Sequence, residues 1–254
     1  MAIVHAITSM SIQEKLEAEL KVRDEFFSAV AHELRNPLNA LHLTLAGLIR
    51  AQSGTMPLPS EQITTRLNRA NTQVTRLARL VDDMLDVSRI SGGRLQLQFE
   101  EFEAIAVVKE VVEHETDSAK PASIALSTPP ALTIRGDRAR FAQIILKLLA
   151  NAIAYGNGHP IQVRLASGDS TIRLEVADHG VGIAEADQER IFERFVKLGK
   201  DTPNVRFGLG LWVAREVARA MHGDIRVSSI VGAGSTFIVE LPKASSESAA
   251  APVR

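Results

Sequence analysis

The stretch FFSAVAHELRNPL, residues 26–38, decides how this chain is interpreted. Its apolar residues Phe27, Val30 and Leu34 follow the three-and-four spacing of a helix face that packs against a neighbour. With Phe27 and Leu34 at heptad position a and Val30 at position d, His32 occupies position f, farthest from the packed seam. We therefore expect an imidazole that faces water, where its neutral form is a good nucleophile near physiological pH.

The neighbours of His32 raise the interest of an otherwise ordinary surface histidine. Glu33 follows directly and could accept a proton or orient the ring, and Asn36 lies one helical turn further on the same face. Pro37 removes a backbone donor from this turn. The local sequence therefore predicts a reactive group rather than a packed one.

Composition limits the classes of protein to which the chain can belong. Its 254 residues suffice for one large or two modest domains, and 29 Lys plus Arg against 30 Asp plus Glu give a net charge of −1. This balance argues against a surface for nucleic acid or anionic membranes. The absence of cysteine excludes disulfides and thiolate chemistry. No apolar stretch approaches the roughly 20 residues of a membrane span, so we expect a cytoplasmic protein.

The first third of the chain has the pattern of two long helices. A helical stripe runs from Ser11 to Arg50, and after a Gly- and Pro-containing turn Ser60 is placed to cap a second helix. The second helix carries a seam of alternating four and three steps: Ile63, Leu67, Ala70, Val74, Leu77, Val81 and Met84. One hairpin can bury only a single stripe of each helix, so the pattern predicts a homodimer with a four-helix bundle.

Ser91-Gly92-Gly93 ends this pattern and marks a domain boundary. The following sequence predicts strands at 95–99, 124–126, 132–134, 161–166, 171–177, 225–229 and 235–241, and helices at 103–114, 138–155 and 209–221. The expected fold class is α+β, with an α/β sandwich whose helices lie on one face of a mixed sheet. The expected domains are an N-terminal helix entry (1–20), the hairpin (21–91), the sandwich (92–242) and a frayed tail (243–254).

Two glycine-rich elements suggest a nucleotide site. The run DHGVG, 178–182, follows a strand, so Asp178 could accept a hydrogen bond from the exocyclic amine of a base; a tight turn is the alternative. The run FGLGL, 207–211, opens a helix whose N–H groups can meet phosphates. A third run, GAGSTF at 232–237, is more typical of a hairpin turn.

The helix predicted at 138–155 carries polar residues in an apolar context. Lys147, Asn151 and Ala154 share one face of it. A buried Asn151 needs partners, and Mg²⁺ carrying phosphate oxygens would be one; a cap or an interhelix hydrogen bond is equally consistent.

Together these motifs resemble the sensor histidine kinases of two-component systems, in which a dimerising phosphoacceptor hairpin precedes an ATP-binding domain of the Bergerat type. The matching segments are the H box at 32–38, the N box at 151–155, the first glycine box at 178–182, the F box at 191–195 and the second glycine box at 208–211. The resemblance covers residues 19–241.

The resemblance implies roles for individual residues. His32 would accept the γ-phosphoryl group of ATP, with Glu33 as base or orienting carboxylate; Asn151 would bind Mg²⁺, and Asp178 would read the adenine amine with Tyr155 nearby. A lid at 196–207 would cover the phosphates. The residues predicted to bind ATP are Lys147, Asn151, Tyr155, Asp178, Gly180, Gly182, Phe195, Lys197, Arg206, Gly208, Leu209, Gly210 and Thr236.

The resemblance also implies partners. The phosphoryl group would pass to an aspartate in the receiver domain of a response regulator, and an upstream sensor domain or protein would supply the signal. Glu33 to Asn36 matches the family's E-x-x-N pattern, in which Asn36 would position a water for dephosphorylation of the regulator. The implied enzyme is therefore bifunctional.

Three positions depart from the family pattern. Lys147 stands where the N box usually has its first Asn, Ala154 where it has Lys or Arg, and Arg206 where the second glycine box often begins with Gly. We hypothesise that Lys147 replaces the phosphate-contacting charge missing at Ala154, at the cost of a weaker metal site.

These departures leave two alternatives to an active kinase. The first is a catalytically weak phosphotransfer or scaffold protein that binds ATP poorly. The second is a Bergerat-type ATPase that uses ATP for conformational change; it is disfavoured because such enzymes do not need a hairpin with an outward histidine.

Overall fold

The computed structural model describes residues 28, 30–51, 59–116, 122–198 and 208–243. The chain divides into two compact units, Met1–Met84 and Leu85–Arg254. Each is considered by itself. The expected helix entry and the tail from residue 244 lie outside the described residues.

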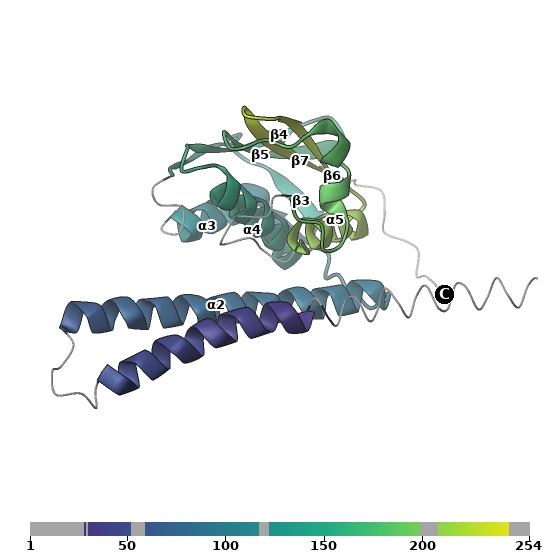
Figure 1. Cartoon of the computed structure of the whole chain (residues 1–254). Helices are drawn as coiled ribbons and strands as arrows, with labels where there is room; N and C mark the ends of the chain where they lie inside the picture. Colours follow the sequence, from purple (N-terminus) through teal and green to yellow (C-terminus); the bar gives the residue numbers. More distant parts are fainter. Residues whose placement is uncertain (1–27, 29, 52–58, 117–121, 199–207, 244–254) are drawn as a thin grey trace, which may run out of the picture. The chain divides into compact units, whose positions relative to one another are not determined.

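The first unit holds the predicted helical hairpin (Figure 1). One helix runs over residues 30–51, and the second, α2, is Ser60–Ser91. A Cβ added to Gly47 would lie 3.1 Å from Nη1 of Arg66, so the Arg66 side chain of α2 reaches the first helix there. α2 begins at Ser60 itself, one residue earlier than the predicted cap at Ser60 implies, and the carbonyl of Pro59 accepts the first N–H bonds of the helix. The predicted part of the first helix at 11–27 lies outside the described residues.

The second unit is built on a five-stranded mixed sheet in the order β2-β4-β5-β7-β6. The strands are β2 (Ile124–Ser127), β4 (Ile161–Ser167), β5 (Thr171–Asp178), β6 (Asp224–Ile230) and β7 (Gly234–Pro242). β2 pairs in parallel with β4, and the other neighbours are antiparallel. A separate antiparallel pair joins β1 (Glu100–Glu103) to β3 (Thr133–Gly136).

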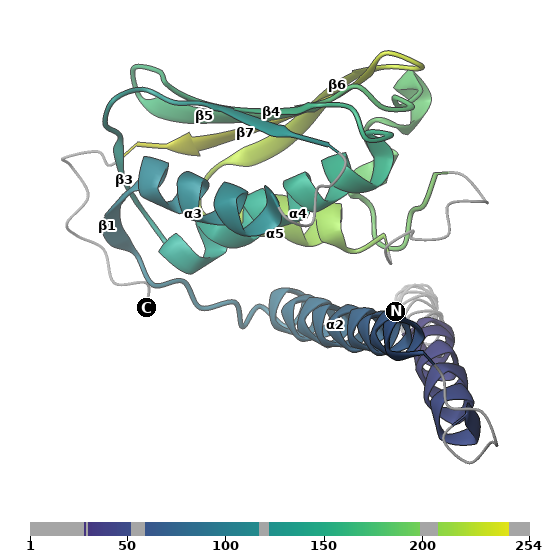
Figure 2. The ribbon, with the colours of Figure 1, turned by 90° about the vertical axis from the view of Figure 1, so that its left-hand side faces the viewer.

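Three helices cover one face of the five-stranded sheet, as Figure 2 shows: α3 (Ala104–Thr116), α4 (Arg138–Tyr155) and α5 (Gly210–Ala220). The core lies between these layers, where Ile144 and Leu148 of α4 and Leu174 of β5 are fully buried. α4 begins where Asp137 caps it, since its carboxylate accepts the N–H of Arg140 at 3.0 Å. The predicted sandwich with helices on one face of a mixed sheet is confirmed.

One predicted strand is wrong. Residues 95–99 are not a strand, and β1 begins only at Glu100. The alternation arises because Leu95 and Leu97 are half-buried while their neighbours are exposed. The backbone N–H of Gln98 donates to the Asp137 carboxylate at 2.9 Å, so its partner is a side chain and not a neighbouring strand.

The division between the two units falls within α2, between Met84 and Leu85, so the last turns of α2 belong to the second unit. Asp86 is buried and forms an ion pair with Arg140 of α4, with Nη1 and Oδ1 2.8 Å apart. Gln143 of α4 donates to the same carboxylate. These charge-assisted bonds join the end of α2 to the first turns of α4. Within the described part of the chain, no helix is long and apolar enough to cross a membrane.

Candidate functional site

His32 lies on the first helix of the hairpin with its side chain exposed, as its heptad position predicts. Glu33 is half-buried beside it, and Asn36 is exposed one turn further along. The helix continues through Pro37, which is buried, so this proline does not end it. The hairpin therefore presents an accessible imidazole next to a carboxylate.

A second group of predicted residues gathers around the end of β5. Asp178 is its last residue and is buried, and its Oδ1 accepts the N–H of Gly180 at 2.9 Å. Burial raises the pKa of the Asp178 carboxyl, and hydrogen bonds from the backbone of Gly180 and Ser235 partly oppose that rise. A buried carboxylate of this kind is suited to accept an N–H bond from a ligand.

Gly180 brings this carboxylate against the end of α4. A Cβ added to Gly180 would lie 1.9 Å from the carbonyl oxygen of Tyr155, so no other residue fits here. The loop after β5 therefore packs against the last turn of α4, and this packing brings Tyr155 near Asp178. Glycine is therefore required here by a close approach to the chain itself.

Sequence reasoning missed Ser235. It lies opposite Asp178 in the pairing of β5 with β7, is buried, and has its Oγ 3.0 Å from that of Ser229. Thr236 instead lies opposite Ala177, and alternation along a strand places its side chain on the other face of the sheet from Asp178. The missing signal was register, because the pairing of β5 with β7 cannot be counted from either strand alone.

The polar face of α4 lies beside the N-terminus of α5. Lys147, Asn151 and Ala154 are all half-buried. A Cβ added to Gly210, the first residue of α5, would lie 3.7 Å from Cδ of Lys147. Lys147 therefore reaches the helix end where N–H groups are available to an anion.

Phe195 and Gly208 join the two ends of the predicted lid. The N–H of Phe195 donates to the carbonyl of Gly208 at 2.8 Å. Gly208 has φ +68°, and a Cβ there would lie 2.5 Å from the carbonyl oxygen of Val196, so glycine is required. Leu209 is fully buried, which leaves only its backbone for a ligand, and Lys197 is exposed. Arg206 and most of the lid, 199–207, lie outside the described residues.

The described residues contain no group of three or more His, Asp or Glu side chains that could hold a metal ion. The oxygen ligand that the sequence predicted for Mg²⁺, the amide of Asn151, stands on the half-buried face of α4. This chemistry fits a hard cation that arrives with phosphate oxygens.

Comparisons with known proteins agree with this architecture. Residues 22–93 match the His Kinase A (phospho-acceptor) domain, and residues 136–245 match the histidine kinase-, DNA gyrase B- and HSP90-like ATPase. The chain is 32% identical over 236 residues to the adaptive-response sensory kinase SasA of Crocosphaera subtropica, covering 91% of this chain and 62% of that protein. The chain thus spans less than two thirds of that relative's length.

Solved structures of histidine kinases have a similar fold. The histidine kinase AdeS of Acinetobacter baumannii superposes with a TM-score of 0.64 at 28% identity, covering 84% of this chain and 98% of the other. Full-length ShkA in complex with AMPPNP gives a TM-score of 0.62 at 28% identity, covering 91% of this chain and 47% of the other.

A phosphoacceptor hairpin followed by a Bergerat-type sandwich defines the class of protein. The chain belongs to the sensor histidine kinases of two-component systems. Its second unit is the ATP-binding domain of that family, and its hairpin is the phosphoacceptor domain.

Proposed function

We propose that this chain is an ATP-dependent protein histidine kinase that phosphorylates its own His32. The observation that carries the proposal is an exposed imidazole beside Glu33 in a phosphoacceptor hairpin, on the same chain as an ATP-binding domain. The family matches favour this function over the weak phosphotransfer alternative.

The proposed reaction is a phosphoryl transfer between nitrogen and oxygen. A ring nitrogen of His32 attacks the γ-phosphorus of ATP, and the bond from that phosphorus to the β–γ bridging oxygen breaks. ADP leaves with the electron pair of that bond, and the proton of the attacking imidazole passes to the carboxylate of Glu33. Phosphohistidine and ADP are the products.

The proposed adenine pocket combines Asp178 with Ser235 and Tyr155. Asp178 would accept the exocyclic amine, and the hydroxyl of Ser235 lies on the same face of the sheet. This set supersedes Thr236, whose side chain lies on the opposite face. The glycines Gly180 and Gly182 would act by letting the loop pack, since Cβ atoms at these positions would lie 1.9 and 2.0 Å from backbone oxygens.

The proposed phosphate site uses the N-terminus of α5 and Lys147. The position of the Lys147 side chain near Gly210 supports our hypothesis that its ammonium supplies the charge missing at Ala154. The other residues predicted to bind ATP on this side are Lys197, Arg206, Phe195, Gly208 and the backbone of Leu209.

We propose Asn151 as the protein ligand of Mg²⁺. An ion bound there would neutralise charge on the triphosphate and so favour its transfer. Lys147, one turn away, adds a second positive charge at the same phosphates.

We propose that the hairpin dimerises through the seam of α2. Four of its predicted apolar seam residues are 38 to 51% exposed in the single hairpin: Ile63, Leu67, Val74 and Val81. A stripe of large apolar side chains at helical spacing is normally covered by another helix. A second copy would complete a four-helix bundle.

The phosphoryl group of His32 would then pass to an aspartate of a response regulator receiver domain. Asn36, exposed one turn from His32, would orient water in the reverse, phosphatase reaction. We place the kinase in the cytoplasm, where its substrate ATP is abundant, with a sensor domain or protein upstream.

The test is incubation of the purified chain with radiolabelled ATP and Mg²⁺, followed by a receiver domain. We expect an acid-labile, alkali-stable label on the chain that moves to the receiver. Absence of the label, with His32 still phosphorylated by a phosphorylated regulator, would overturn the kinase and favour the phosphotransfer alternative. Release of inorganic phosphate without phosphohistidine would point to an ATPase.

A further inference from the structure

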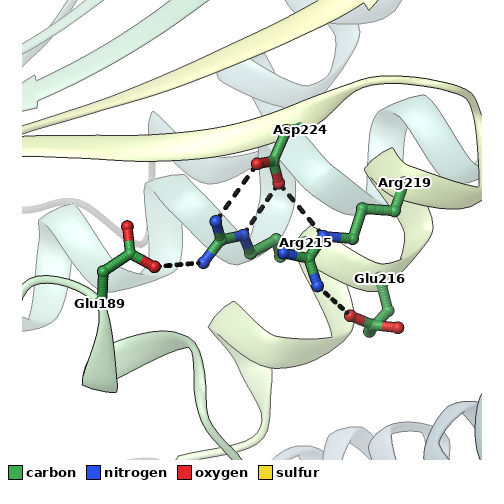
Figure 3. A network of polar contacts seen from close by, with 5 residues as sticks. All are labelled: Glu189, Arg215, Glu216, Arg219 and Asp224. Carbon is green, nitrogen blue, oxygen red and sulfur yellow. Dashed lines mark hydrogen bonds and ion pairs between the residues drawn. The ribbon is translucent and has the colours of Figure 1, made fainter.

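Arg215 of α5 is held by two other parts of the second unit, β6 and the segment 189–195; Figure 3 shows its contacts with Asp224 and Glu189. Its Nε and Nη2 donate to the two carboxylate oxygens of Asp224 at 2.8 and 3.2 Å, and its Nη1 donates to Glu189 at 2.9 Å. Its guanidinium carbon lies 4.7 Å from the centroid of the Phe192 ring. The side chain is only 13% exposed. A planar guanidinium is the group that can make a bidentate pair and a stacking contact at once.

The electrostatics of this cluster are unequal. Its bonds to Asp224 raise the pKa of Arg215, whose charge is therefore permanent, and lower the pKa of Asp224. Asp224 also lies 3.4 Å from Nε of Arg219. The Glu189 side chain is 82% exposed, so its ion pair alone contributes little. The contact with the ring of Phe192 must carry more of the attachment on that side.

Phe192 ends a short 3-10 helix, Arg190–Phe192, that leads into the proposed phosphate side of the site. Its ring is buried and meets Phe237 of β7 edge-on, with centroids 6.4 Å apart. Three residues later the N–H of Phe195 donates to the carbonyl of Gly208. Because only two residues separate Phe195 from Phe192, we expect the packing of Phe192 to set the position of Phe195.

A second contact ties the same segment to α5 in the opposite sense. The guanidinium carbon of Arg194 lies 4.2 Å from the centroid of the Trp212 ring. An arginine of α5 thus covers an aromatic ring of the segment, and an arginine of the segment covers an aromatic ring of α5. Two reciprocal contacts fix both the distance and the direction of the segment on the helix.

From this geometry we infer that Arg215 is a positioning residue for nucleotide binding. It fixes the segment 189–195 on α5 and so sets where Phe195 and Lys197 stand relative to the N-terminus of α5. The inference rests on the proposed function, because it assigns Lys197 to the phosphates. It predicts an effect on the phosphate part of ATP and none on the adenine pocket.

The test compares ATP with adenosine on the full chain. For Arg215→Lys, which keeps the charge but loses the bidentate and stacked geometry, we expect about tenfold weaker binding of ATP with Mg²⁺. Adenosine, measured by NMR titration, should bind within about twofold of wild type, because Asp178 and Ser235 are untouched. A purely structural defect would weaken both ligands alike, and that result would overturn the inference.

Arg194→Ala and a control variant keep the test decisive if Arg215→Lys folds poorly. Arg194→Ala, an exposed residue, should also weaken ATP more than adenosine, whereas the control Glu216→Gln, whose partner is Arg219, should change neither. In the Lys197→Ala background, Arg215→Lys should weaken ATP binding by clearly less than tenfold, because one of the two residues that it positions is gone. Additive losses would overturn the inference. Failure of the wild type to bind ATP would instead overturn the proposed function, and the inference with it.

Discussion

The helical hairpin and the α/β unit are both built from amphipathic helices, yet they bury their apolar side chains to different degrees. In α4, Ile144 and Leu148 are fully buried against the sheet, whereas in α2 Leu67 and Val74 remain 51% and 50% exposed. The α/β unit therefore has a complete core by itself. In the described part of the hairpin the apolar stripe of α2 stays exposed, which supports the proposed dimer. The α/β unit is thus proposed to bind a ligand, and the hairpin to assemble.

The largest expected effect tests whether the α/β unit supplies the phosphoryl donor. Asn151→Ala should lower autophosphorylation by about 100-fold or more, because the proposed Mg²⁺ ligand is lost. Sedimentation should show the same dimer as the wild type, since Asn151 is not on the hairpin. Phosphorylation at the wild-type rate would show that Asn151 holds no catalytic metal.

The next effect tests whether the hairpin is incomplete alone. The double substitution Val74→Lys and Val81→Lys would bury charge in the proposed dimer seam. We therefore expect the dimer dissociation constant to rise by about 100-fold or more. Analytical ultracentrifugation measures it. The matched control places the same two charges at Thr72 and Ala78, which are exposed and lie off the seam. Equal weakening by both pairs would contradict the proposed seam.

A smaller effect is expected at the phosphate side of the α/β unit. Lys147→Ala should weaken ATP binding by about tenfold, which corresponds to about 1.4 kcal/mol, because one charge at the triphosphate is removed. Lys109→Ala, an exposed lysine of α3, is the control and should leave the affinity unchanged. Unchanged affinity in Lys147→Ala would refute the replacement of the missing charge at Ala154.

The smallest effect is a dependence of binding on pH. Burial raises the pKa of Asp178, so it takes up a proton at a higher pH than an exposed aspartate as the solution is acidified. The protonated carboxyl is a poorer acceptor for the adenine amine, so adenosine should bind more weakly as the pH falls towards that pKa. Asp178→Asn should bind weakly throughout and lack this component of the pH profile. A profile shared by both proteins would remove Asp178 from the adenine pocket.

The same shift has the opposite sign for stability. A carboxyl whose pKa is raised by folding contributes stability at low pH and loses it as the pH rises through the folded pKa. Weaker adenosine binding in acid could therefore not be explained by unfolding caused by Asp178.

Local features of the structure could be predicted from the sequence, whereas features that depend on contacts between distant segments could not. Periodicity predicted α4 at Arg138–Tyr155 with both of its ends, and the exposure of His32 followed from one heptad. The prediction of a strand at 95–99 was wrong because Leu95 and Leu97 alternate with exposed residues but have no neighbouring strand to pair with. The pattern reports which side is buried, and the backbone of Gln98 bonds to Asp137 instead.

The site shows the same limit. Asp178 and the glycine runs could be found from local motifs, but Ser235 required the register between β5 and β7. The cluster around Arg215 joins residues from 189 to 224, and nothing in the local sequence of any one of them indicates the others. Contacts between distant segments are set by packing, which one sequence does not display.

Locating the phosphoryl group tests most directly whether His32 is the phosphoacceptor. The wild type and His32→Gln are incubated with Mg²⁺ and radiolabelled ATP, and nucleotide binding is measured in parallel. We expect equal affinity for ATP in both proteins, an acid-labile label confined to the peptide containing His32, and no label in the variant. An equally labelled His32→Gln would contradict the role of His32 as phosphoacceptor.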